Sequence, residues 1–207
     1  MFQKSIKLIN ANCSGEIGDV IVSGVDKPHG DTILEQSNYL FINKKLRNIV
    51  LHEPRGGVFK HVNLIVPSIN KKAEIGFIIM EPEDNPPMSG SNCICVATVV
   101  LEKNIVPMKE PTTKFNIEAP GGLIKIVASC NNGKVQNVSI ENLPSFVDQL
   151  DATIEVEGLG SLRVDTAFGG DSFVLLKAKD VGLRLLPDQA KDIVNISTKI
   201  IEATNKQ

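Results

Sequence analysis

Apolar and polar residues alternate along most of the chain, and this period of two predicts a strand-rich protein. Proline, glycine and asparagine separate the alternating runs, and Asn131-Asn132-Gly133 between two of them predicts a hairpin. The expected strands cover residues 17–25, 60–66, 74–80, 114–118, 123–130, 135–142, 154–156, 161–164 and 173–177. Helices are expected at 31–41 and at about 187–204, where apolar residues gather on one side. The second helix has Ala190, Ile193, Val194, Ile200 and Ile201 on one side.

One stretch breaks this pattern. In PPMSGSNCICVATVVL, at 86–101, small polar residues are followed by a run that is apolar on almost every side. Its valines and isoleucine suit a buried strand, but about 13 residues from Gly90 is long for a strand and favours a helix. Ser89 suits the N-cap, and Lys103 with Pro107 suits the stop. A helix apolar on all sides must be enclosed by protein. We therefore expect a single α+β domain over residues 1–207, with strands around a central helix.

The start of this helix is the candidate binding site. The amides of Gly90, Ser91 and Asn92 would lack intrahelical acceptors and carry partial positive charge, which favours an anion. Glycine at position 90 lets a ligand approach the backbone. The alternative interpretation is a plain helix cap that binds nothing.

Charge and cysteine content exclude several classes of protein. A net charge of −2 over 207 residues argues against nucleic acid or an anionic membrane as partner. No window approaches the roughly 20 apolar residues of a membrane span. The four cysteines, at 13, 93, 95 and 130, form no CxxC pair, and the whole sequence has only three histidines. Both observations argue against a metal site. The cysteines are interpreted as reduced thiols of a cytoplasmic protein.

Several blocks together resemble the proline racemase family. They are GEIGDVIVSGV at 15–25, GDTILEQ at 30–36, HEPRGGVFKHVNLIVP at 52–67, PPMSGSN at 86–92, EAPGGLI at 118–124 and VDTAFGGDSFVL at 164–175. Their joint occurrence in this order covers nearly the whole chain. The resemblance implies a fold similar to diaminopimelate epimerase. In that fold each of two halves is a curled, mostly antiparallel, barrel-like sheet around a central helix.

The resemblance also implies an activity. Enzymes of this family act at the α-carbon of proline or hydroxyproline without pyridoxal phosphate or metal, using one proton-transferring residue from each half. Ser89 would be the catalytic residue of this half, where racemases have cysteine, and Gly90, Ser91 and Asn92 would bind the substrate. PPMSGSN is most similar to the serine-type branch, associated with trans-3-hydroxy-L-proline dehydratase and 4-hydroxyproline 2-epimerase. Proline racemase and a non-catalytic imino-acid-binding module are the alternatives.

Three departures from the family pattern qualify this interpretation. Asn10-Ala11-Asn12 stands where the family commonly has Asp-x-His, and Ser91 stands where racemases have histidine. The Gly-Thr-Gly loop of the second half does not occur in this sequence. We therefore expect an N-terminal half, inactive alone, whose helix at about 187–204 leads toward a second half. A homodimer or a separate C-terminal half is the expected macromolecular partner.

Overall fold

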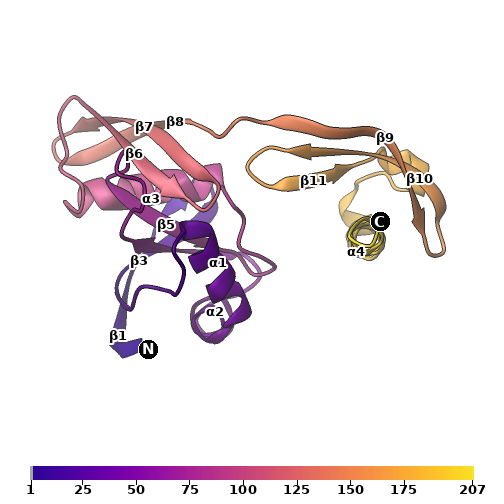
Figure 1. The fold of residues 1–207 in the computed structure, drawn as a ribbon, viewed down its shortest axis with the longest axis horizontal. Coiled ribbons are helices and arrows are strands. Elements are labelled where there is room, and N and C mark those ends of the chain that lie inside the picture. The colour runs from indigo at the N-terminus through magenta and orange to yellow at the C-terminus, as the bar shows by residue number, and fades with distance from the viewer. Residues whose placement is uncertain (1) are drawn as a thin grey trace. The chain divides into compact units, whose positions relative to one another are not determined.

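The computed structural model describes residues 2–207, with side chains from residue 5 onward (Figure 1). Where the sequence pattern predicts one domain, the described chain divides into two compact units, residues 1–143 (unit 1) and residues 144–207 (unit 2). Each unit has its own apolar core: two clusters of buried side chains lie in unit 1 and a third lies in unit 2. No helix in the described residues is long and apolar enough to cross a membrane.

Unit 1 is dominated by one sheet. Within residues 2–207 this sheet has eight strands in the order β1-β3-β4-β5-β6-β7-β8, with β2 paired to β3. The β3–β4 and β5–β6 pairs are parallel and the others antiparallel. The strands are β1 Phe2–Ile9, β2 Asn12–Cys13, β3 Glu16–Val25, β4 Lys60–Val66, β5 Ile75–Met80, β6 Thr112–Ala119, β7 Gly122–Asn131 and β8 Lys134–Glu141. The helices are α1 Ile33–Ile42, α2 Lys45–Leu51 and α3 Gly90–Glu102.

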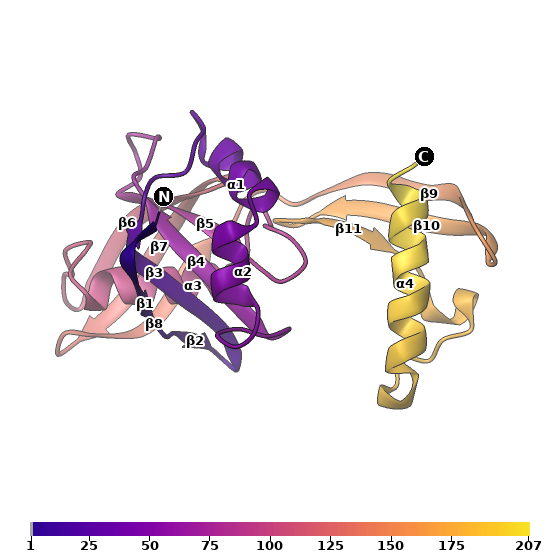
Figure 2. The ribbon, with the colours of Figure 1, turned by 90° about the horizontal axis from the view of Figure 1, so that it is seen from below.

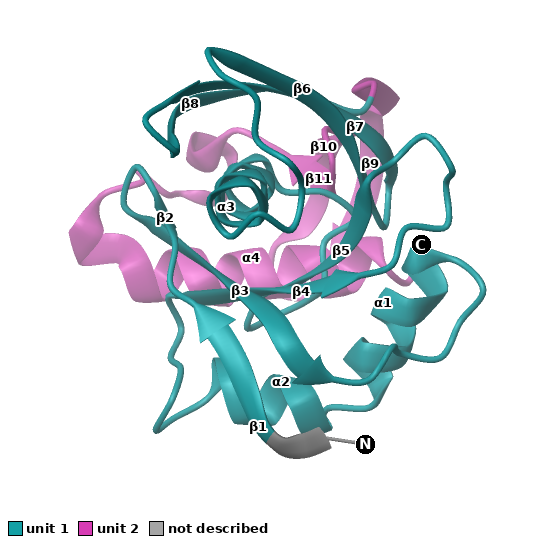
Figure 3. Cartoon of the chain, turned by 90° about the vertical axis from the view of Figure 1, so that its left-hand side faces the viewer, with its two compact units in different colours: residues 1–143 teal, residues 144–207 magenta. Residues whose placement is uncertain are grey.

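The sheet curls around α3, which Figure 3 shows end-on among the strands. The helix contacts β2, β3 and β4 on one side and β8 on the other. Its residues are buried or half-buried along its whole length, and Val96 and Val100 belong to the same buried cluster as Phe77 and Ile117. The apolar run is therefore a helix and not a strand, as its length predicts. Within the described residues no ladder joins β8 to β1, so the sheet is curled but open.

A second layer covers the opposite face of the sheet, where α1 and α2 lie over β4 and β5 (Figure 2). Thr32 caps α1, and Glu35 bonds back to the cap amide, which fixes the start of the helix. Leu46 and Leu51 of α2 are buried against Val62 and Leu64. Each such side chain contributes about 1.5–3 kcal/mol by leaving water.

Unit 2 is a three-stranded antiparallel sheet with one long helix. Its strands, in spatial order, are β11 Ser172–Leu175, β10 Gly160–Phe168 and β9 Phe146–Val156. Two 3-10 turns, η1 Ala178–Val181 and η2 Pro187–Gln189, lead to α4 Ala190–Thr204. Ile200 of α4 packs against Ile154 and Leu162. The helix expected at about 187–204 is thus present, and α4 starts directly after η2.

Candidate active site

Ser89 occupies the N-cap position of α3 in extended conformation, and the first helical hydrogen bond runs from Cys93 N to its carbonyl oxygen at 3.0 Å. Ser89 is thus the N-cap residue, as predicted, although its Oγ makes no capping hydrogen bond. That oxygen instead accepts from Asn92 Nδ2 at 3.0 Å and lies 3.3 Å from Ser91 Oγ. The amides of Gly90, Ser91 and Asn92 precede the first helical bond and remain the anion-attracting end of the helix.

Gly90 leaves this end of the helix open. A Cβ placed on Gly90 would meet only Ile140 Cδ1 at 3.5 Å, which is ordinary contact. The protein itself therefore tolerates a side chain here, and the space that glycine leaves is available to a ligand.

The side chain of Asn92 is completely buried. Asn63 Nδ2 donates to Asn92 Oδ1 at 2.8 Å, and Asn92 Nδ2 donates to Glu81 Oε1 at 3.1 Å as well as to Ser89. A buried amide that makes these bonds has its polar atoms satisfied, which offsets the cost of burying it. The Asn92 side chain therefore supports Ser89 from inside the protein.

Strand alternation explains how polar residues reach the interior here. In β4, Val62 and Leu64 face α1 and α2, so His61 and Asn63 face α3. Gly18 of β3 makes room for the contact. A Cβ on Gly18 would lie 3.0 Å from Asn92 Oδ1 and 2.9 Å from Cys95 Sγ.

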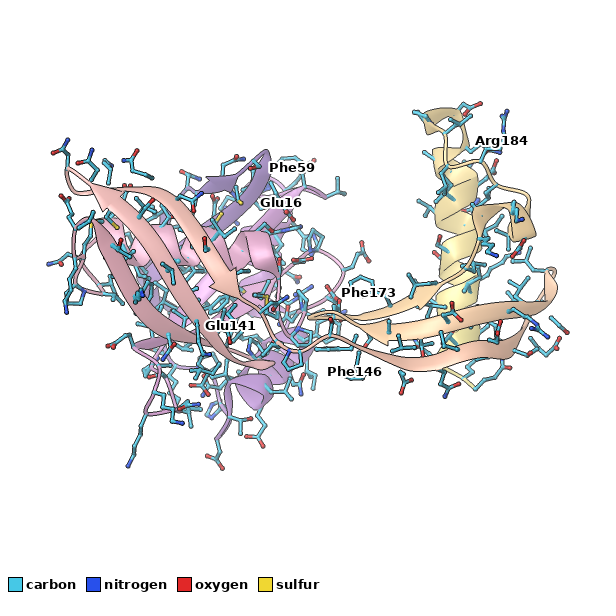
Figure 4. The ribbon with its side chains drawn as sticks, turned by 90° about the horizontal axis from the view of Figure 1, so that it is seen from above. Glu16, Phe59, Glu141, Phe146, Phe173 and Arg184 are labelled. Carbon is cyan, nitrogen blue, oxygen red and sulfur yellow. The ribbon has the colours of Figure 1, made fainter. Side chains whose placement is uncertain are left out.

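A histidine and two carboxylates extend this network. His61 Nδ1 lies 3.1 Å from Glu16 Oε1, 3.5 Å from Glu81 Oε1 and 3.4 Å from Asn92 Nδ2. Glu16 starts β3 and is 46% exposed, so the network reaches solvent at this residue (Figure 4). We refer to Ser89, Asn92, Asn63, His61 and Glu81 as the Ser89 network.

Residues around Asn10 form a separate polar cluster. Asp19 accepts from Asn10 Nδ2 at 3.0 Å and from Ala11 N at 3.1 Å, and it forms an ion pair with Lys60. These residues line a cavity of about 260 Å³ together with Asn12 and Ile17. Asn10, which replaces the family's usual aspartate, therefore has a structural partner of its own.

The cysteines lie mostly in the core. Cys93 and Cys95 are 0% and 2% exposed, and burial raises the pKa of each thiol to about 12. All four cysteines are free thiols. Within residues 2–207 no cluster of three or more histidine, cysteine, aspartate or glutamate side chains is arranged to hold a metal ion.

The sequence motif did not predict the buried part of the site. Ser89, Gly90, Ser91 and Asn92 lie together, as the motif predicts, but the motif does not include His61. The sequence did contain a signal. In KHVNLIV, His61 and Asn63 alternate with apolar residues, and the apolar residues indicate a buried strand. Polar residues on the inward side of such a strand need partners inside the protein.

Together, fold and site define a class of protein. It is an α+β protein in which a curled sheet surrounds a helix, and the start of that helix presents free amides and a supported hydroxyl. Such a start suits a small anionic molecule.

The chain belongs to the proline racemase family, whose sequence profile, described as "Proline racemase", matches residues 8–207. It is similar to a hydroxyproline epimerase of Agrobacterium vitis solved with bound trans-4-hydroxy-L-proline. The two are 38% identical with a TM-score of 0.83, over 95% of this chain and 58% of that one. A probable proline racemase of Agrobacterium radiobacter K84, solved with bound carbonate, is 37% identical with a TM-score of 0.83. That match covers 93% of this chain and 57% of the other, so this chain spans less than three fifths of either protein.

Proposed function

We propose that the chain supplies one side of the active site of a cofactor-independent enzyme acting at the α-carbon of a hydroxyproline, with 2-epimerisation of 4-hydroxyproline as the reaction. The observation that carries the proposal is the similarity, at 38% identity over 95% of the chain, to an epimerase holding trans-4-hydroxy-L-proline. Ser89 is the proposed catalytic residue. Gly90, Ser91 and Asn92 would bind the substrate carboxylate through their backbone amides.

The geometry around Ser89 supports this assignment. An imino-acid carboxylate is a small anion, and the start of α3 offers it amides that no helical carbonyl occupies. Ser89 Oγ lies on the same turn, held by Asn92. A carboxylate bound to the amides would place its own α-carbon next to the serine hydroxyl. This is the arrangement that proton transfer at the α-carbon requires.

Inversion of the α-carbon needs two groups on opposite faces, one to remove the proton and one to return it. Ser89 accounts for one group. We propose that the second comes from a further lobe, carried by a separate chain or by a second copy, and that the chain alone does not turn over. On this proposal unit 1 corresponds to the N-terminal lobe of the family.

Dehydration of trans-3-hydroxy-L-proline is the second candidate, and the serine at position 89 favours it. A serine hydroxyl is a much weaker base than the thiol that the family's racemases use, whose ordinary pKa is about 8.5. Loss of water from a 3-hydroxyproline needs only one strong base. A weak partner at position 89 is therefore easier to accommodate in a dehydratase than in a racemase.

One ligand and two variants test the proposed site. Titration of the chain with trans-4-hydroxy-L-proline, followed by NMR, should give saturable shifts at residues 89–92. Ser89→Ala should weaken binding by roughly 3- to 10-fold, the effect of losing one hydrogen bond. Ser172→Ala, an exposed serine of unit 2, is the matched control and should bind as the native chain does. Saturable shifts elsewhere, or none at all, would reject Ser89 as the site.

The activity of the chain together with an added second lobe of the family decides between the two reactions. Epimerisation is measured by the change in optical rotation of 4-hydroxyproline, and dehydration by the ultraviolet absorbance of the unsaturated product of trans-3-hydroxy-L-proline. Neither should be seen with the chain alone. Turnover by the purified chain that disappears in Ser89→Ala would refute the need for a second lobe while supporting Ser89.

A further inference from the structure

The amide group of Asn92 can be oriented in only one way, and this determines the direction of its hydrogen bond to Ser89. At one end, Asn63 Nδ2 lies 3.3 Å from the carbonyl oxygen of Asp19 and 2.8 Å from Asn92 Oδ1. A carbonyl oxygen only accepts, so the nitrogen of Asn63 must face it. Asn63 therefore donates to Asn92, and Asn92 Oδ1 is the acceptor.

The other end of Asn92 gives the same answer independently. Glu81 Oε1 lies 3.1 Å from Asn92 Nδ2. A carboxylate oxygen would repel the amide oxygen at this distance, so the nitrogen must point to Glu81. His61 Nδ1 lies 3.1 Å from Glu16 Oε1 and 3.4 Å from Asn92 Nδ2, so its hydrogen is placed best toward Glu16. The two hydrogens of Asn92 are left for Glu81 and Ser89.

A consequence follows for the serine hydroxyl. Because Asn92 donates to Ser89 Oγ, the hydrogen of Ser89 cannot point toward Asn92. It must point away from the core, toward Ser91 Oγ at 3.3 Å or toward a ligand at the start of α3. The buried residues thus fix the direction of a hydroxyl hydrogen at the mouth of the site.

We propose that Asn92 is a positioning residue that makes Ser89 the proton donor of the site. This rests on the proposed function, since it assigns a direction to the proton transfer of Ser89. The group on the opposite face takes the α-proton and leaves its electron pair on the α-carbon. Ser89 then gives its hydrogen to that carbon from its own face. The electron pair of the broken O–H bond stays on Oγ, and Asn92 Nδ2 donates to the resulting alkoxide, a stronger bond than to a neutral hydroxyl.

Asn92→Asp tests the inference with little change of shape. The new carboxyl group can accept from Asn63, and the one proton that it shares with Glu81 Oε1, 3.1 Å from the replaced nitrogen, leaves none for Ser89, so Ser89 would turn its own hydrogen inward. Binding of trans-4-hydroxy-L-proline should weaken by roughly 3- to 10-fold, as expected for one lost hydrogen bond. Asn137→Asp, the same change at an exposed position of β8, should leave binding unchanged.

A double variant separates positioning from direct contact. If Asn92 acts only through Ser89, Ser89→Ala with Asn92→Asp should bind no more weakly than Ser89→Ala alone. Independent, multiplying losses would show that the Asn92 side chain acts on the ligand directly or through the fold, and would overturn the inference. Circular dichroism establishes that each variant is folded before its binding is compared.

A second measurement does not depend on a ligand or on the stability of Asn92→Asp. In ¹H–¹⁵N NMR spectra, Ser89→Ala should shift one of the two Asn92 side-chain amide protons and leave the one bonded to Glu81 in place. If both protons keep their shifts, Asn92 does not donate to Ser89 and the inference is wrong. If trans-4-hydroxy-L-proline fails to bind the native chain, the proposed function fails, and these amide shifts alone decide whether Asn92 orients Ser89.

Discussion

The guanidinium of Arg47 donates to the carbonyl oxygen of Asp84 at 2.9 Å, although the two residues are 37 positions apart. Arg47 is 5% exposed and also donates to the carbonyl oxygens of Glu81 at 2.8 Å and Pro82 at 3.1 Å, and to Asn85 Oδ1. Burial lowers the pKa of Arg47, and the negative charges of Asp84 and Glu83 oppose this effect. One buried arginine thus holds the segment that leads from β5 toward Ser89.

Replacing this arginine should destabilise unit 1. Arg47→Met leaves three carbonyl oxygens without this donor, and each lost bond to a charged group is worth roughly 1.5–3 kcal/mol. We expect the free energy of unfolding to fall by at least one such increment, measured by urea denaturation. Arg163→Met, at an arginine with a 76% exposed side chain in unit 2, is the control and should change it by less than about 0.5 kcal/mol. Equal effects of the two variants would contradict the role assigned to Arg47.

Gly90→Ala should separate ligand binding from stability. The added Cβ meets only Ile140 Cδ1 at 3.5 Å, and alanine in the first turn favours the helix by about 0.4–1 kcal/mol. We expect unchanged or higher thermal stability together with weaker binding of trans-4-hydroxy-L-proline. Gly18→Ala gives the opposite comparison, because its Cβ would lie 2.9 Å from Cys95 Sγ inside the protein and should lower stability. A Gly90→Ala chain that binds as tightly as the native one would show that ligands do not approach this turn.

The sequence predicts most elements of unit 1 and the outer part of its site, for identifiable reasons. Both α3 and the hairpin at Asn132-Gly133 have local signals. The signal for α3 is a run of apolar residues, and the signal for the hairpin is a pair of residue types that adopt positive φ, as both do here. The helix α2 was not predicted, since its seven residues carry no side-chain cap. The start of β9 was missed because residues 146–151 are exposed and show no alternation of burial.

The interior of the site could not be predicted for a different reason. Arg47 and Asn63 are polar residues whose hydrogen-bond partners are 29 to 44 positions away in the sequence. No local pattern records such pairs. The sequence therefore predicts Ser89 as a candidate through its own motif, and only the fold reveals which side chains contact Ser89 from inside the protein.

Cysteine reactivity should follow burial and pKa. Cys93 and Cys95 have pKa values raised to about 12, so both stay protonated and unreactive near pH 8. Cys13 is half-buried and should be alkylated first by iodoacetamide, whereas the other three thiols should react only in urea. Mass spectrometry of the labelled peptides gives the order. Because the folded pKa values lie above the ordinary value of 9.0, the two thiols should favour the folded state below about pH 9 and lose this contribution as the pH rises toward 12. Rapid labelling of Cys93 in the native chain would contradict the burial of α3.

The apolar side of α4 is partly buried and partly exposed. Ile200 is 4% exposed and belongs to the core of unit 2, so part of this side covers the unit's own sheet. Val194 and Ile201 are 63% and 52% exposed. On the strands of the same unit, Val147, Phe173 and Leu175 are also about half exposed. Unit 2 therefore has apolar side chains available to a partner on both its helix and its sheet.

We predict that the chain self-associates, or binds a separately supplied second lobe, through these side chains of α4. Full burial of one such residue is worth roughly 1.5–3 kcal/mol, and several are needed to offset the entropy lost on association. Val194→Lys with Ile201→Lys should shift the sedimentation coefficient at micromolar concentration to that of a monomer, because burying either charge is costly. Ser197→Lys, which adds the same charge at an exposed polar position of α4, should leave association unchanged. A native chain that sediments as a monomer, alone and with a second lobe of the family added, would refute the prediction.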